Sequence, residues 1–74
     1  MPLNMERMAS AMRGYRVMAR YTQDEAAQAV NISRVTLSSY ENGAVAPQVD
    51  IAWALAELYG VSLDELVGYR KEES

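Results

Sequence analysis

The sequence predicts an all-α domain of five short helices. Apolar residues recur at spacings of three and four along most of the chain, which is the period of an amphipathic helix. Residues that cap helices precede these stretches, and Gly or Asn follows several of them. β-Branched residues do not alternate with polar ones over a useful length, so no strand is expected. Because 74 residues fill a single core, we expect one domain over residues 1–68 and a polar tail over 69–74.

The first helix is expected to begin after Asn4, which can cap its N-terminus, and to end near Arg20. Four apolar residues lie on one side of it at spacings of three and four: Met5, Met8, Met12 and Tyr15. We interpret these methionines, together with Met18, as residues of the core rather than as an interaction surface.

The second and third helices are expected on either side of a tight turn. Residues 22–25, Thr-Gln-Asp-Glu, form a capping box that opens the second helix, which ends at Asn31-Ile32. Ser33 caps the third helix, which is expected over about residues 34–41 and stops at Asn42-Gly43.

The fourth and fifth helices follow a loop over residues 44–47 that contains a proline. The fourth helix is expected to start at Gln48 or Val49 and to end at Gly60. Its apolar side carries Ile51, Ala52, Leu55, Ala56 and Tyr59. Residues 62–65, Ser-Leu-Asp-Glu, form a second capping box, which opens the short fifth helix.

The composition excludes several classes of function. The chain has neither Cys nor His, so it has no disulfide and we expect no metal site. No apolar run approaches the roughly 20 residues that cross a bilayer, and the N-terminus does not resemble a signal peptide, so a cytoplasmic protein is expected. We also find no nucleophile–base set and no phosphate-binding glycine loop. An enzyme is therefore not expected, and neither is a cofactor.

The charges are unevenly distributed along the chain. The formal net charge is −3, which by itself disfavours binding to phosphate. Residues 1–43 nevertheless carry five Arg against four acidic residues, whereas residues 44–74 carry two basic residues against six acidic ones. A surface that faces nucleic acid is therefore expected in the first half of the chain. The acidic second half is equally consistent with a role in solubility alone.

The third helix has an unusual outer face. With Leu37 pointing inward, Glu41 lies one turn further along the same side. The outer side presents short polar groups around one small apolar residue: Ser33, Arg34, Val35, Ser38, Ser39 and Asn42. Such a surface suits the major groove of DNA. Arginine can donate two hydrogen bonds to guanine, serine can bond to either kind of base edge, and valine can pack on a thymine methyl group.

Residues 22–43 resemble the helix-turn-helix of the phage-repressor family, the lambda-repressor and Cro group that is also called Xre-type. The family pattern is Ser-Gln-x-x-Leu-Ala, a Gly-Val-Ser turn, a helix that closes on Tyr-Glu-Asn-Gly, a proline, and a Leu-Gly-Val-Ser-Leu-Asp-Glu-Leu ending. The similarity extends over roughly residues 6–68. The matching residues are Thr22-Gln23, Ala27, Asn31-Ile32-Ser33-Arg34, Leu37-Ser38, Tyr40-Glu41-Asn42-Gly43, Pro47 and Tyr59-Gly60-Val61-Ser62-Leu63-Asp64-Glu65-Leu66.

The resemblance implies a transcriptional regulator that reads double-stranded DNA with its third helix, residues 33–42. The residues that would face base edges are Ser33, Arg34, Val35, Ser38 and Ser39. The residues that would contact the phosphate backbone are Gln23, Thr36 and Asn42. It also implies an ion pair between Arg16 and Glu41, which would tie the first helix to the third.

A symmetric operator implies a homodimer. We expect its interface around the fifth helix and the tail, with Leu66, Val67 and Tyr69 as candidates. Trp53 lies off the apolar side of the fourth helix and should be partly exposed. It either covers the neighbouring loop or contributes to a dimer contact, since aromatic residues are enriched in interfaces.

The sequence departs from the family pattern at three places, and a second function also stays open. Arg20 stands where the family commonly has Gly, so it either adopts a left-handed backbone, at about 1 kcal/mol, or extends the helix. Ala26 replaces a Leu, and residues 44–46 lack the basic residues that usually lie there. The alternative is a protein-interaction module, such as an antitoxin or an anti-repressor partner. The acidic charge and the apolar loop favour this alternative, whereas Gln23 and Arg34 favour DNA binding.

Overall fold

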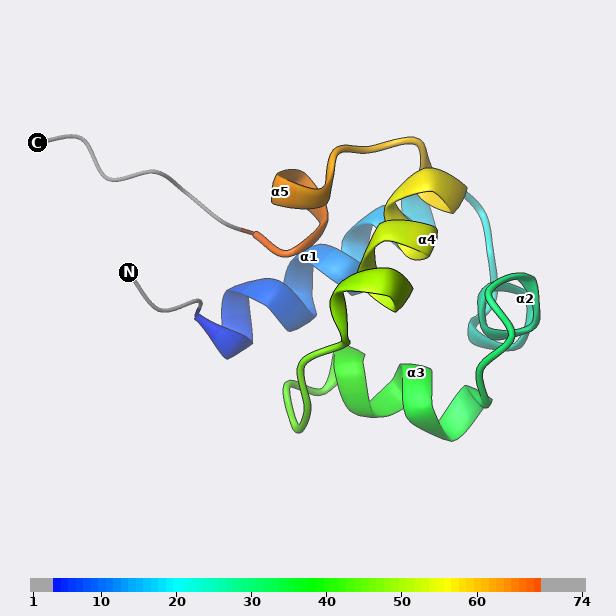
Figure 1. The fold of residues 1–74 in the computed structure, drawn as a ribbon, viewed down its shortest axis with the longest axis horizontal. Coiled ribbons are helices and arrows are strands. Elements are labelled where there is room, and N and C mark those ends of the chain that lie inside the picture. The colour runs from blue at the N-terminus through cyan, green and yellow to red at the C-terminus, as the bar shows by residue number, and fades with distance from the viewer. Residues whose placement is uncertain (1–3, 69–74) are drawn as a thin grey trace, which may run out of the picture.

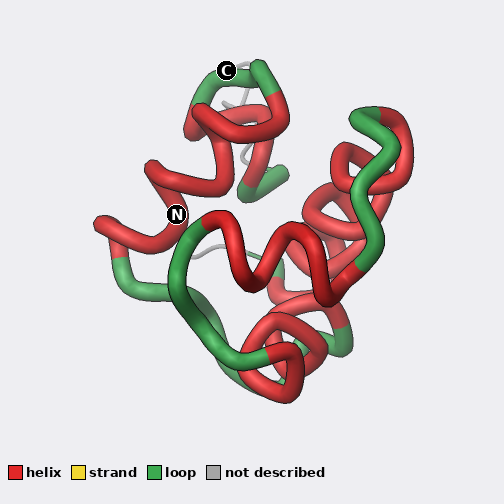
Figure 2. Tube along the Cα trace, turned by 90° about the vertical axis from the view of Figure 1, so that its right-hand side faces the viewer, coloured by secondary structure: helices red, strands yellow, loops and turns green. Residues whose placement is uncertain are grey.

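The computed structural model describes residues 4–68, and the expected polar tail lies outside this part of the chain. These residues form five helices and no strand, as predicted (Figure 1). The helices are α1 (Met5–Met18), α2 (Gln23–Ala29), α3 (Arg34–Glu41), α4 (Val49–Tyr59) and α5 (Leu63–Leu66). Short loops join them around a common centre (Figure 2).

Side-chain caps fix the starts of four helices. Asn4 accepts a hydrogen bond from the Arg7 amide at 3.0 Å and so caps α1. Ser33 caps α3 by accepting from the Thr36 amide at 3.0 Å. Both predicted capping boxes are present, at the start of α2 and at the start of α5. The N-terminal signals in the sequence therefore predict the helix starts correctly.

Within residues 4–68, two residues other than glycine have a left-handed backbone. Arg20 has φ +69°, so α1 ends before it and the helix is not extended. Asn31, in the turn between α2 and α3, has φ +63°. Asn tolerates this region better than Arg, because its short polar side chain can hydrogen-bond locally. The strain expected at Arg20 is therefore present in the fold.

The core is formed by side chains from all five helices. Its largest fully buried members are Met8, Met12, Leu37, Leu55 and Leu66. Met5 is half-buried against the core, but Met18 is 75% exposed, so the prediction that it belongs to the core was wrong. Met18 lies six residues after Met12, which turns it about 120° away from the buried side of α1.

Candidate nucleic-acid interface

The α2–α3 unit is held together by small buried side chains and a tight turn. Ala26 and Ala27 are almost fully buried, so the backbones of the two helices can lie close together. The Ile32 amide donates to the Ala27 carbonyl at 2.9 Å, and the Ile32 side chain packs against the core. The turn thereby fixes the direction in which α3 leaves α2.

A buried ion pair ties this unit to α1. Arg16 Nε donates to Glu41 Oε2 at 2.8 Å, and Arg16 Nη2 donates to Glu41 Oε1 at 3.2 Å. A third bond, from Arg16 Nη1 to the Tyr21 carbonyl at 2.8 Å, reaches the segment before α2. Glu41 is only 2% exposed, so the pair inferred from the family resemblance is present and buried. The pair joins α1 to α3, and Arg16 also joins both to the segment that precedes α2.

Gln23 is part of the same network, which the sequence did not indicate. Its Nε2 donates to Glu41 Oε1 at 3.1 Å, so the buried carboxylate accepts from both Arg16 and Gln23. The side chain of Gln23 is half-buried at the first position of α2. One amide hydrogen is used by Glu41 and the second remains available to another acceptor. Gln23 is therefore held in place while it keeps a free donor.

Arg34 is loosely held next to Gln23. Arg34 Nη1 donates to Gln23 Oε1 at 3.4 Å, and Arg34 Nε lies 3.5 Å from Asp24 Oδ1. Both charged side chains are well exposed, at 57% for Arg34 and 73% for Asp24. Exposed ion pairs of this kind contribute at most about 1 kcal/mol. Arg34 can thus leave Asp24 at little cost when a stronger acceptor approaches.

The other outward residues of α3 and its two caps form hydrogen bonds with residues three or four positions away. Val35 is 70% exposed, and its carbonyl accepts from the Ser39 hydroxyl at 3.1 Å. Asn42 Nδ2 donates to Ser38 Oγ at 3.4 Å. The hydroxyls of Ser33 and Thr36 lie 2.8 Å apart. Because the proton of Ser39 is already used, this residue presents its lone pairs outward and can accept a hydrogen bond from a base.

One buried side chain behind the interface has a perturbed pKa. Burial, and secondarily the charge of Glu41, raises the pKa of Tyr59 to about 12. Its hydroxyl oxygen is buried without a hydrogen-bond partner among residues 4–68. The ring lies next to Tyr21, with 6.2 Å between the ring centroids. Tyr59 thus packs behind the Arg16–Glu41 pair as a neutral side chain.

The family assignment follows from comparison with known proteins. The model of the helix-turn-helix family HTH_3 matches residues 12–66, which is most of the chain. The chain belongs to this Xre-type family. It is a DNA-binding transcriptional regulator and not an enzyme, in agreement with the prediction from sequence.

Three relatives illustrate the range of this Xre-type family. The chain is 45% identical over 53 residues to the transcriptional regulator ImmR of Bacillus subtilis, covering 72% of this chain and 42% of ImmR. It is 34% identical over 59 residues to the phage CTXphi repressor RstR of Vibrio cholerae, covering 80% of this chain and 53% of RstR. The regulator MJ0272 of Methanocaldococcus jannaschii is 27% identical over 66 residues, which cover 89% of this chain and all of MJ0272. The chain thus spans about half the length of ImmR and RstR.

Solved structures share the fold. The P22 c2 repressor in complex with a synthetic operator has a TM-score of 0.77 at 26% identity, covering 82% of this chain and 94% of that chain. The regulator ClgR of Corynebacterium glutamicum also has a TM-score of 0.77 at 26% identity, covering 89% and 86% of the two chains. The all-α, repressor-like fold predicted from the sequence is therefore confirmed.

The dimer residues suggested for this Xre-type domain need one correction. Leu66 is fully buried in the core, so its side chain is not available to a second copy. Leu66 is the last residue of the four-residue helix α5, which packs against α1 and α4. Val67 is half-buried at the surface, and Tyr69 lies outside the described residues. Val67 alone remains as a described candidate.

Other kinds of site are not found in residues 4–68. This part of the chain contains no group of three His, Cys, Asp or Glu side chains that could hold a metal ion. None of its helices is long and apolar enough to cross a membrane.

Proposed function

We propose that this Xre-type domain is a repressor that binds a specific DNA sequence in the cytoplasm, with α3 in the major groove. The observation that carries the proposal is the division of α3 into two faces. Its inner face, with Leu37, Tyr40 and Glu41, is buried and tied to α1. Its outer face is open, and Val35 and Arg34 project from it. A helix held so firmly on one side is suited to insertion into a groove.

Each outward residue has a role in this proposal. The base-reading residues are Ser33, Arg34, Val35, Ser38 and Ser39, and Arg34 reads a guanine with two hydrogen bonds. The backbone contacts are made by Gln23, Thr36 and Asn42, which set the register without reading sequence. Gln23 suits this role because its second amide hydrogen is free at the N-terminus of α2, where the helix dipole favours a phosphate.

Two copies are needed for a specific site of useful length. Helix α3 has eight residues and is therefore about 12 Å long, so it spans only a few base pairs. We propose that a homodimer places two copies of α3 in half-sites one helical turn apart. The interface involves Val67 and residues that follow it.

A second function is supported by the acidic side of the molecule. Residues 44–68 contain no Lys or Arg, and the loop over residues 44–46 is exposed without a cation. This surface is poorly suited to phosphate. We propose that it binds another protein, as an anti-repressor partner or antitoxin would require.

Selection from a pool of random-sequence duplexes, at two salt concentrations, tests the DNA-binding function. The wild type should enrich a two-fold symmetric sequence. The Arg34→Ala variant should bind the selected site about 1–3 kcal/mol more weakly, and its preference at one base pair per half-site should relax. Arg13→Ala removes the same charge at an exposed position of α1 that is assigned neither to DNA nor to the dimer, and it should leave the selected sequence unchanged.

Two results would contradict the proposal. If Arg34→Ala weakens binding to all sequences equally, Arg34 contacts phosphate and does not read a base. If the wild type enriches no sequence and binds only at low salt, the protein-binding function becomes the main one. An enriched site without two-fold symmetry would exclude the homodimer while it leaves the role of α3 intact.

A further inference from the structure

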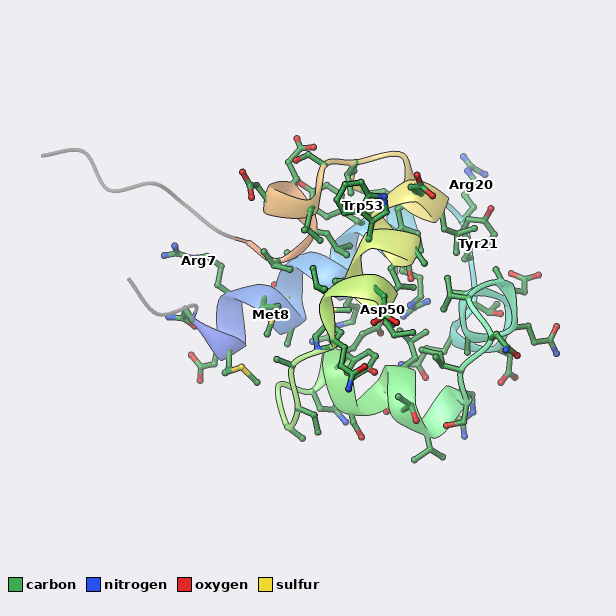
Figure 3. The ribbon with its side chains drawn as sticks, in the orientation of Figure 1. Arg7, Met8, Arg20, Tyr21, Asp50 and Trp53 are labelled. Atoms are coloured by element: carbon green, nitrogen blue, oxygen red, sulfur yellow. The ribbon has the colours of Figure 1, made fainter. Side chains whose placement is uncertain are left out.

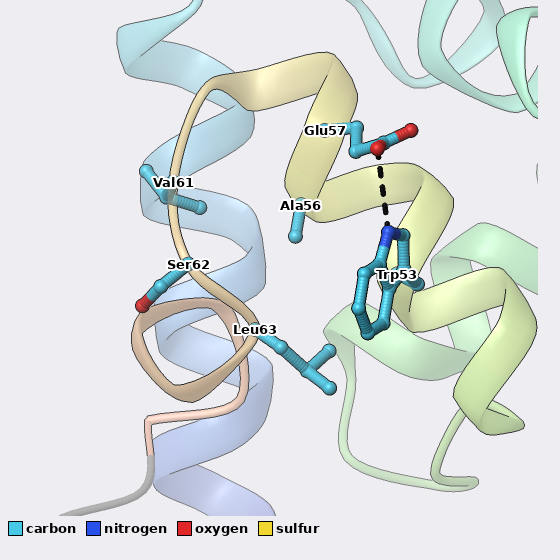
Figure 4. Close-up of a pocket in the computed structure, with 6 residues that line it drawn as sticks. All are labelled: Trp53, Ala56, Glu57, Val61, Ser62 and Leu63. Carbon is cyan, nitrogen blue, oxygen red and sulfur yellow. Dashed lines mark hydrogen bonds between the residues drawn. The ribbon is translucent and has the colours of Figure 1, made fainter.

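Helix α4 presents an exposed apolar stripe on the side away from the core. Val49 is 68% exposed and Trp53 is 57% exposed, one helical turn apart on α4. Glu57 is the next residue on this stripe, and its Oε2 accepts from Trp53 Nε1 at 3.3 Å. The indole is therefore held flat beside α4 (Figure 4). Large apolar side chains in such a position mark interaction sites.

Two hollows lie beside this stripe, and Leu63 lines both of them. One, of about 210 Å³, is lined by Trp53, Ala56, Glu57, Val61, Ser62 and Leu63 (Figure 4). The other, of about 330 Å³, is lined by Met8, Ala46, Pro47, Val49, Ala52, Leu63, Asp64 and Val67. We call the two hollows together with Val49 and Trp53 the α4–α5 groove. Neighbouring apolar hollows along one line match the way in which an amphipathic helix inserts side chains one turn apart.

Among the described residues, the charged side chains that line the groove are negative, and the cation of Arg7 lies beyond one end of it, against Gly68. Asp50 is exposed in the first turn of α4, three residues before Trp53 (Figure 3). Glu57 lines one hollow and Asp64 lines the other. As residues 44–68 contain no Lys or Arg, no cation of these two helices offsets the three carboxylates. The groove therefore has an apolar floor and an acidic rim.

We propose that the α4–α5 groove binds a basic amphipathic segment of another protein, with apolar side chains in the hollows and Lys or Arg side chains on the rim. Complementary charge is what selects this occupant. A second copy of this chain is disfavoured beside Trp53, because a symmetric contact there would bring Glu57 against its own equivalent. The homodimer proposed above uses Val67, at the other end of the groove, and the residues that follow it. DNA is excluded by the carboxylates of the rim. The proposal does not depend on which bases α3 reads.

Trp53 is the single tryptophan of the chain and reports directly on the groove. The probes are a short helical peptide of Leu and Lys and a matched peptide of Leu and Glu, added to the purified full chain. The Leu–Lys peptide should shift the Trp53 emission to shorter wavelength and saturate at one peptide per chain, whereas the Leu–Glu peptide should not. The double variant Glu57→Gln/Asp64→Asn should weaken binding about threefold at low salt.

A pair of matched variants separates groove binding from general adhesion. Val49→Lys places a cation in the groove and should weaken binding of the Leu–Lys peptide by at least about tenfold. Val17→Lys makes the same change at a valine of α1 that is 58% exposed, outside the groove, and should leave binding unchanged. Equal loss in both variants, or equal binding of both peptides, would overturn the proposal. A concentration-dependent Trp53 shift without peptide, abolished by Val49→Lys, would also overturn it and identify a second copy as the occupant.

Discussion

Gln23 donates a hydrogen bond from Nε2 to Glu41 Oε1 at 3.1 Å, so the last residue of α3 holds the first residue of α2. The same carboxylate is bound by Arg16 of α1. A single buried charge therefore connects the fold to the surface that we propose contacts DNA. Stability and binding geometry depend on the same few atoms, and variants at these positions can separate the two.

Removing one partner of the buried Arg16–Glu41 pair should lower the stability of the fold more than removing both partners. Arg16→Met leaves the carboxylate of Glu41 buried without its guanidinium, at a cost of about 3–5 kcal/mol. This is a large part of the roughly 4–11 kcal/mol expected for a domain of this length. In urea unfolding, Arg16→Met and Glu41→Leu should each be strongly destabilised, and the double variant should be more stable than either. If the effects of the two single variants simply add, the pair makes no coupled contribution.

Gln23→Ala should weaken DNA binding by about fivefold without changing sequence preference. The reason is that the substitution removes one donor to phosphate, a contact that fixes position and carries no sequence information. Competition between duplexes of different sequence measures both quantities, and Gln28→Ala, at an exposed position of the same helix, is the control. A changed preference at the base pair read by Arg34 would mean that Gln23 acts by orienting Arg34, with which it shares a 3.4 Å hydrogen bond.

The elements that the sequence predicted are those set by local chemistry. Capping residues such as Thr22 and Ser62 indicate helix starts, because the glutamates that complete each capping box lie only three residues further along the chain. The burial of Leu37 and Glu41 follows from helical period once one inward residue is chosen. Such features require no knowledge of how the helices pack.

The features that the sequence missed depend on tertiary contacts. The bond between Gln23 and Glu41 joins residues 18 positions apart and forms only where α2 packs against α3. Leu66 is buried because the four-residue helix α5 docks on the core. A helix of this length has too few residues for its sequence pattern to show which side faces inward. The left-handed backbone of Asn31 had a signal in the sequence, since Asn31 stands where the family pattern has a glycine.

Arg20→Gly should stabilise the fold by about 1 kcal/mol relative to Arg20→Ala. Both variants lose the arginine side chain, but only glycine adopts φ +69° without a steric penalty. The comparison of their urea midpoints therefore isolates the backbone effect. Equal midpoints would indicate that the end of α1 relaxes into another conformation when the side chain is shortened.

Tyr59 should make the fold sensitive to alkaline pH. Its folded pKa, raised to about 12, exceeds the ordinary value of 10.0, so above pH 10 the unfolded chain loses the proton first. Stability is then lost as pH rises from about 10 to 12, by at most about 1.4 kcal/mol per pH unit from this group. Tyr59→Phe should flatten this part of the profile. At neutral pH it should be at least as stable as the wild type, because the buried hydroxyl has no hydrogen-bond partner in residues 4–68. An unchanged profile would assign the alkaline loss to other groups.

Asp24→Asn should increase binding to DNA of arbitrary sequence more than binding to the selected site. Asp24 lies next to Gln23 at the start of α2, where its charge opposes a phosphate, and its Oδ1 lies 3.5 Å from Arg34 Nε. Without that charge, Arg34 is free to bind any phosphate, and affinity for mixed-sequence duplex should rise by up to about fivefold at low salt. The specificity ratio, measured by titrating both duplexes at two salt concentrations, should therefore fall.

Asp64→Asn is a close control for this change, because the two aspartates occupy equivalent positions. Each is the second residue of a helix that opens with a capping box, Asp24 in α2 and Asp64 in α5. Both variants lose the same favourable interaction with a helix N-terminus, and only the variant at position 24 should alter DNA binding. An equal rise for both duplexes would mean that Asp24 only repels phosphate. A loss confined to the selected site would mean instead that Asp24 holds Arg34 in the orientation that reads the base.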